Sequence, residues 1–106
     1  MAKHLKIYTV CGLGIGSSIV LKISVGKILD QLGLEDYSLD VADVGTAQSI
    51  DYDMAITNIE LSQVLMGSLP EDQKYKVVPV VNFIDKEEMK SKISACLDTM
   101  REKGII

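Results

Sequence analysis

Four short apolar runs divide the chain. They are rich in β-branched and aromatic residues, as strands are, and they cover residues 5–10, 37–44, 52–57 and 76–83. The first run is apolar on both faces, which is typical of a central strand covered on both sides. The second alternates apolar and polar residues, and Pro79 interrupts the fourth, so both of these strands are expected at the edges of a sheet.

The stretches between these runs have helical periodicity instead, with apolar residues every three or four positions. The periodicity predicts helices over residues 19–32 and 59–66, one helical turn over 47–51, and a last helix that opens at Asp85. A break is expected at Gly45 and Thr46, and a polar connection over 71–75. The expected buried faces are Leu21, Val25, Ile28, Leu29 and Leu32; Leu61, Val64 and Leu65; and Met89, Ile93, Cys96, Leu97 and Met100.

Strands that alternate with helices predict a parallel sheet with helices on both faces. With the first strand central and the second and fourth at the edges, the strand order is 2-1-3-4. We therefore expect an α/β fold, a single three-layer sandwich in one domain over residues 1–106. Ligands of such sheets bind outside the carboxyl ends of the strands. The loop after the first strand should therefore lie beside Thr57 and Asn58, at the end of the third.

Composition narrows the function without fixing it. The chain has 106 residues, 47% of them apolar, and a net charge of −4 with scattered lysines, which argues against nucleic-acid binding. It shows neither a signal-peptide core nor an apolar stretch long enough to cross a membrane, so we expect a cytoplasmic protein without direct membrane insertion. Two cysteines and one histidine, far apart in sequence, support neither a disulfide framework nor a zinc site, and no cofactor is expected.

Candidate chemistry is concentrated in the turn that follows the first strand. The sequence Val10-Cys-Gly-Leu-Gly-Ile-Gly-Ser-Ser18 leads from that strand into the first helix. Unpaired N–H groups and the helix dipole make such a turn an anion site, and glycines let the backbone approach an oxyanion closely. A thiol at this place should have a lowered pKa. We expect Cys11 to be a nucleophile that carries a phosphate ester, held by Gly12, Leu13, Gly14, Ile15, Gly16, Ser17 and Ser18.

Several other functions fit the sequence of this turn less well than a phosphate-carrying cysteine does. Its third glycine comes one residue too early for a dinucleotide-binding fingerprint, and it lacks the Gly-Lys-Ser/Thr ending of a nucleotide triphosphatase loop. A thiol redox protein would need a second cysteine nearby, and Cys96 is expected in the core. The Cys-x5-Arg signature of cysteine phosphatases matches in spacing, but Ser17 holds the position of the arginine. Without that guanidinium, a phosphocysteine should wait for an acceptor rather than hydrolyse quickly.

The loop resembles the phosphorylation loop of enzyme IIB components of the bacterial sugar phosphotransferase system. The nearest pattern is the Cys-Gly-x-Gly-x-Gly-Ser-Ser loop of the L-ascorbate type, with the lactose and galactitol types more distant. This resemblance implies that Cys11 accepts a phosphoryl group from a phosphohistidine of enzyme IIA. It also implies that Cys11 passes the group to a sugar, L-ascorbate or a related carbohydrate, bound by the membrane enzyme IIC. The alternative is a small cysteine-dependent phosphatase or arsenate-reductase-like enzyme.

Overall fold

The computed structural model describes residues 4–11, 15–34, 36–81 and 85–104, with the backbone alone for Cys11 and residues 15–18. Strands and helices alternate along the chain, as expected. The elements are β1 (Leu5–Cys11), α1 (Ile15–Gln31), β2 (Tyr37–Asp43), α2 (Val44–Ser49), β3 (Met54–Asn58), α3 (Ile59–Gly67), the 3-10 helix η1 (Glu71–Lys76), β4 (Val77–Val80) and α4 (Lys86–Glu102).

The four strands form one parallel sheet in the order β2-β1-β3-β4, which confirms the predicted topology. β1 pairs with β2 along its whole length, so that Cys11 lies opposite Asp43. Its pairing with β3 is shorter and ends at Thr9, opposite Ile56. β1 and β3 therefore separate before either strand ends, and this separation lies at the carboxyl end of the sheet.

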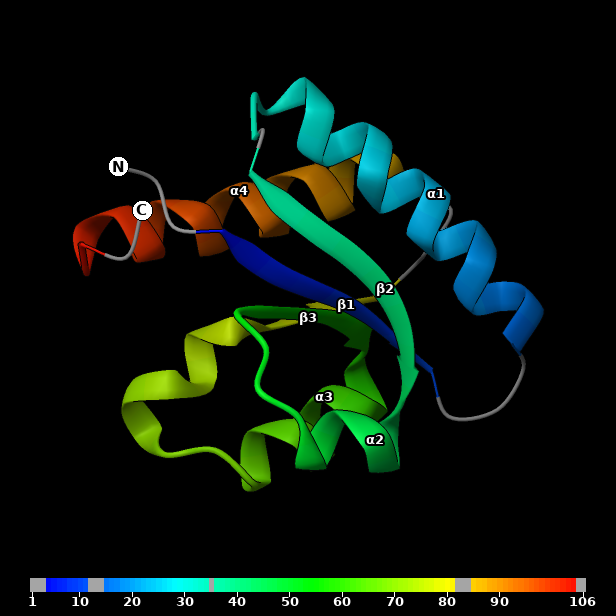
Figure 1. Cartoon of the computed structure of the whole chain (residues 1–106), viewed down its shortest axis with the longest axis vertical. Coiled ribbons are helices and arrows are strands. Elements are labelled where there is room, and N and C mark those ends of the chain that lie inside the picture. The colour runs from blue at the N-terminus through cyan, green and yellow to red at the C-terminus, as the bar shows by residue number, and fades with distance from the viewer. Residues whose placement is uncertain (1–3, 12–14, 35, 82–84, 105–106) are drawn as a thin grey trace.

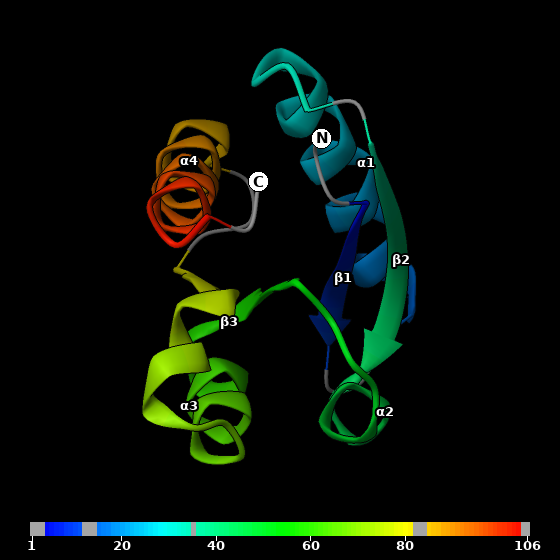
Figure 2. The same cartoon turned by 60° about the vertical axis from the view of Figure 1, so that its left-hand side comes forward.

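Helices cover both faces of this sheet (Figures 1 and 2). α1 and α4 lie on one face, where Leu5 and Ile7 of β1 pack with the apolar sides of both helices. α2 and α3 lie on the other face, where Val10 packs with Ala47 and Leu65. The alternation of side chains along β1 thus divides the core into two layers.

The predicted faces of α1 and α4 are confirmed. Leu21, Val25, Ile28 and Leu29 are buried, and Leu32 is partly buried against them. All five residues of the stripe on α4 are buried as well, namely Met89, Ile93, Cys96, Leu97 and Met100. Gly33, with φ of +80°, follows α1 in the left-handed conformation that ends helices.

The expected start of the first helix was wrong by one turn. α1 begins at Ile15 rather than Ile19, so Ser17 and Ser18 lie inside its first turn and do not cap it. Glycine and serine lower helix propensity by less than about 1 kcal/mol each relative to alanine. Burial of the later turns of α1 outweighs this local preference.

Three other expectations also need correction. The break expected at Gly45 and Thr46 is helical, because the Asp43 carboxylate caps α2 by accepting from the Thr46 N–H at 2.6 Å. The connection expected over residues 71–75 forms η1. On α3, Val64 is 46% exposed, and its place in the buried face is taken by Ser62, whose hydroxyl donates to the Ile59 carbonyl.

The last strand lies at the edge of the sheet, as Pro79 predicted. β4 is shorter than the expected strand, and its expected end over residues 82–83 falls outside the described residues. The start of α4 agrees with the sequence, because the Asp85 carboxylate accepts from the backbone N–H groups of Glu87 and Glu88.

Candidate functional site

The candidate site lies where the carboxyl ends of β1 and β3 separate. The chain reaches β2 from β1 through α1, and it then crosses to the other side of β1 to form β3. This gap is therefore the point at which the strand order reverses, where parallel sheets bind their ligands. Cys11 is the last residue of β1 and lies beside this gap. The sequence placed the loop after β1 beside Thr57 and Asn58. These two residues form the carboxyl end of β3, whereas residues 12–14 of the loop lie outside the described residues.

Two polar side chains at the end of β3 organise this neighbourhood. The Thr57 hydroxyl donates to the backbone carbonyl of Val10 at 2.8 Å, and both residues are fully buried. The Asn58 side chain accepts from the Leu61 N–H at 2.8 Å and so caps α3. Thr57 thus connects β3 directly to the peptide unit that precedes Cys11.

The first turn of α1 follows β1 after three residues and has N–H groups that no carbonyl of the helix can accept from. Because the helix begins at Ile15, the N–H groups of Ile15, Gly16 and Ser17 have no partner within the helix. They point toward the amino end of the helix, where the helix dipole also favours an anion. Gly12, Leu13 and Gly14 lie outside the described residues, as do the side chains of Cys11, Ile15, Ser17 and Ser18. Their roles remain predictions.

Asp43 is a neighbour of Cys11 that the sequence analysis missed. It ends β2 opposite Cys11 and is exposed, while its carboxylate caps α2. The hydrogen bond from the Thr46 backbone N–H lowers the pKa of Asp43 below its usual value. A fixed negative charge therefore lies on the strand next to Cys11. The Asp-Val-Gly-Thr order after the second strand was the available signal, because it matches an N-cap residue followed by a helical turn.

Exposed apolar side chains surround this end of the molecule. Ile19, Val20 and Ile23 form a stripe on α1 and are 50%, 65% and 56% exposed. Ile59 opens α3 directly after β3, and Val81 directly follows β4. Each of these residues lies in a segment that follows the carboxyl end of a strand. The stripe on α1 is exposed apolar surface of the kind to which proteins dock.

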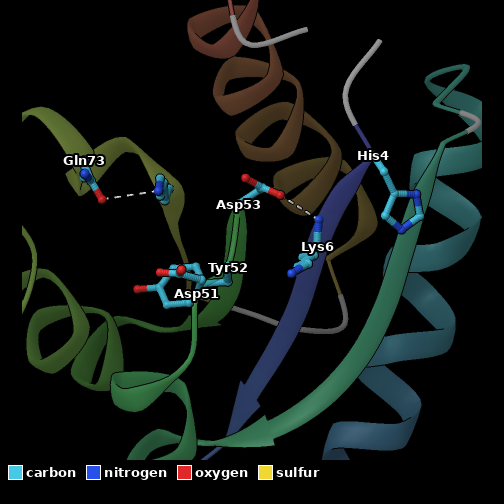
Figure 3. Close-up of a pocket in the computed structure, with 7 residues that line it drawn as sticks. His4, Lys6, Asp51, Tyr52, Asp53 and Gln73 are labelled. Atoms are coloured by element: carbon cyan, nitrogen blue, oxygen red, sulfur yellow. Dashed lines mark hydrogen bonds between the residues drawn. The ribbon is translucent and has the colours of Figure 1, made fainter.

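Cavities among the described residues also lie away from this site, and two of them bear on its interpretation. One, of about 320 Å³, is at the opposite end of the sheet (Figure 3). Its polar lining is largely paired: Asp53 accepts from the Lys6 N–H, and the Lys76 ammonium donates to Gln73. The other is an apolar groove between β4 and α4 that includes Cys96.

Cys96 does not belong to the candidate site. Its thiol is buried on α4 and donates to the Tyr75 carbonyl at 3.2 Å. Burial raises the pKa of Cys96 from 9.0 to about 12, so the nucleophilic thiolate is absent near neutral pH. The expectation that Cys96 is a core residue is confirmed.

The described residues contain no group of three or more histidine, cysteine or acidic side chains placed to hold a metal ion. Among the helices of that same part of the chain, none is both long and apolar enough to cross a membrane.

Comparisons with known proteins agree with this architecture. A family model described as "PTS system, Lactose/Cellobiose specific IIB subunit" matches residues 6–95. A Mycoplasma pneumoniae protein named "Ascorbate-specific PTS system EIIB component" is 31% identical over 97 residues, which are 90% of this chain and 97% of that protein.

A solved structure of a protein tyrosine phosphatase from Entamoeba histolytica is similar over 96% of this chain and 99% of its own. Its TM-score is 0.51 and its sequence identity is 15%. At this identity the likeness concerns the fold alone, a parallel sheet with a loop after its first strand.

Proposed function

Because the chain belongs to the family of phosphotransferase-system IIB subunits, in which IIB works with a IIA protein and a membrane IIC protein, we propose that Cys11 is its phosphorylation site. Phosphohistidine on enzyme IIA is the donor, and a sugar bound by enzyme IIC is the acceptor. The observation that carries the proposal is the place of Cys11, at the end of the central strand and just before the unpaired N–H groups of α1.

The transfer has two steps that balance without a cofactor. The Cys11 thiolate attacks phosphorus in line, an S–P bond forms, and the N–P bond of the phosphohistidine breaks with its electron pair on the imidazole. A sugar hydroxyl then attacks the same phosphorus, and sulfur leaves as thiolate while the hydroxyl proton passes to a base on the acceptor side. N–H groups of residues 12–18 and the hydroxyls of Ser17 and Ser18 hold the three phosphoryl oxygens.

The exposed apolar side chains at this end of the molecule support a carrier that meets two proteins in turn. Ile19, Val20 and Ile23 lie on the second and third turns of α1, the helix that follows the loop. A carrier needs an accessible docking surface, and these exposed side chains provide apolar area for one. The same surface must receive IIA first and IIC afterwards, because both must reach one sulfur atom.

The acceptor is L-ascorbate or a related carbohydrate under this proposal. The Cys-Gly-x-Gly-x-Gly-Ser-Ser pattern and the name of the Mycoplasma pneumoniae relative both favour the ascorbate type. The description of the matching family favours lactose or cellobiose instead. Sugar specificity resides in IIC, so purified IIC partners decide between these acceptors.

A stand-alone phosphatase is the alternative, and the loop argues against it. Ser17 occupies the position where a cysteine phosphatase carries arginine, so the charge that stabilises a phosphoryl group during hydrolysis is missing. A phosphocysteine formed here should persist until an acceptor arrives.

Labelling with radioactive phosphate from a phosphorylated IIA tests the proposal. We expect about one phosphate per wild-type chain, none on Cys11→Ser, and normal labelling of Cys96→Ala, the matched control at the buried cysteine. Labelled Cys11→Ser would overturn the assignment. Multiple turnovers of a simple phosphate ester by the isolated protein would favour the phosphatase.

A further inference from the structure

The short ladder between β1 and β3 is extended at both ends by side-chain hydrogen bonds. Before the ladder, the Asp53 carboxylate accepts from the Lys6 backbone N–H at 2.8 Å (Figure 3). After it, the Thr57 hydroxyl donates to the Val10 carbonyl, also at 2.8 Å. Each bond lies one residue beyond the last paired residues of β1. The two bonds lie at opposite ends of one strand pair. At the Lys6 end the Asp53 backbone N–H also donates to the Lys6 carbonyl at 2.8 Å, so that end keeps a backbone bond of its own.

Only the Thr57 bond lies at the reactive end. The Val10 carbonyl belongs to the same planar peptide unit as the Cys11 N–H. Fixing that oxygen therefore fixes the plane that leads into Cys11. β2 continues to pair with β1 as far as Cys11, but β3 no longer does. On the β3 side, the Thr57 hydroxyl makes the hydrogen bond to β1 that lies nearest to Cys11.

Burial makes the hydrogen bond between Thr57 and Val10 hard to replace. Thr57 and Val10 are both 0% exposed, so water does not replace the hydroxyl if it is lost. An unpaired carbonyl at this depth is destabilising, so the peptide would shift to find another donor. The shift would occur one bond away from the residue that must present sulfur to two partners.

Resting on the proposed function, we propose that Thr57 is a positioning residue for Cys11. By holding the Val10 carbonyl, it keeps the end of β1 and the start of the phosphate loop in the orientation that in-line transfer requires. Thr57 acts through the backbone and needs no contact with the phosphoryl group. Small misplacements of a reacting group reduce transfer rates by about a hundredfold per ångström.

Three variants separate positioning from stability. Thr57→Val removes the hydroxyl while keeping the shape, and Thr57→Ser restores a donor. Asp53→Ala is the control at the far end of the same ladder: it removes the side-chain bond to the Lys6 N–H and leaves the backbone bond from the Asp53 N–H to the Lys6 carbonyl. For each variant we would measure the urea unfolding free energy, the rate of phosphoryl transfer from phosphorylated IIA, and the pH dependence of Cys11 alkylation by iodoacetamide.

We expect Thr57→Val and Asp53→Ala both to lower stability. Only Thr57→Val should slow phosphoryl transfer, by about tenfold or more, and move the midpoint of Cys11 alkylation to higher pH. Thr57→Ser should recover most of the transfer rate and most of the wild-type alkylation midpoint. Equal effects of Thr57→Val and Asp53→Ala on transfer and alkylation would overturn the proposal. If IIA does not label the wild-type chain, the proposed function fails, and the alkylation series alone decides the role of Thr57.

Discussion

Two buried threonines on neighbouring strands show how much a single hydroxyl changes at the residue scale. Thr57 has a partner at 2.8 Å, whereas the Thr9 hydroxyl is fully buried and has no partner among the described residues. Residue type and apolar surroundings are alike for both, so the sequence alone does not distinguish them. The difference arises from where β1 and β3 separate, which is a property of the folded sheet.

Replacing Thr9 with valine should therefore stabilise the protein. The substitution keeps the shape and β-branching and removes a hydroxyl that lost its water on folding. We expect the free energy of unfolding to rise by about 1–2 kcal/mol, measured by urea denaturation. A less stable Thr9→Val would show instead that the hydroxyl is satisfied in solution, for instance by a buried water.

Cys96 should make stability depend on pH in the alkaline range. Its pKa is raised by burial from 9.0 to about 12, so below pH 9 the thiol is protonated whether the chain is folded or unfolded. Between pH 9 and 12 the unfolded chain loses the proton first, and the folded state loses stability by up to about 1.4 kcal/mol per pH unit.

The variant Cys96→Ala lacks this dependence of stability on alkaline pH. At pH 7 it should be less stable than the wild type by roughly 1–2 kcal/mol, as for a small truncation in a core. The difference should shrink as the pH rises above 9, which urea denaturation at pH 7, 9 and 10 would detect. A constant difference across these pH values would contradict a buried, protonated thiol.

At the scale of elements, the edge strand β4 is protected against pairing with another chain. The Val77 N–H is bonded to the Lys74 carbonyl of η1, and two residues later Pro79 has no N–H. The next outward group, the Val81 N–H, donates to the Glu88 carboxylate at 2.8 Å. Each outward N–H along this edge is thus absent or occupied, which suppresses edge-to-edge association.

Pro79→Val should weaken this protection, since it places a free N–H in the middle of the edge. We expect stronger self-association than in the wild type as concentration rises, measured by sedimentation velocity. Pro70→Val is the control, because Pro70 precedes η1 and lies outside the sheet. Equal association of both variants would mean that Pro79 does not guard the edge.

The elements also show which parts of the fold can be read from the sequence. Pro79 and the alternation in the second strand were sufficient to place both edges and hence the strand order. The start of α1 was missed, because Gly16, Ser17 and Ser18 have weak helix propensity and the burial of later turns decides the outcome. Val64 was misassigned because periodicity does not say which of two neighbouring stripes meets the sheet.

At the scale of the whole molecule, the topology brings together groups that are distant in sequence. The end of β1, the first turn of α1 and the end of β3 lie at one place because the strand order reverses there. The general position of the site could be predicted for this reason. The Thr57–Val10 bond and the place of Asp43 beside Cys11 could not, because both depend on register.

The same topology places the polar cavity and Cys11 at opposite ends of β1. The cavity near Lys6 and Asp53 lies at the amino end of β1, whereas Cys11 lies at its carboxyl end. The apolar stripe of Ile19, Val20 and Ile23 lies on the Cys11 side. Under the proposed function, a protein that docks on this stripe would approach the end of the sheet that carries Cys11.

Phosphorus NMR of the chain, after incubation with the general phosphotransferase components and IIA, tests the central claim most directly. The account predicts one phosphothiol resonance that is absent in Cys11→Ser and disappears when IIC with its sugar is added. Persistence of that resonance in Cys11→Ser, or a signal from phosphate on another residue, would contradict it.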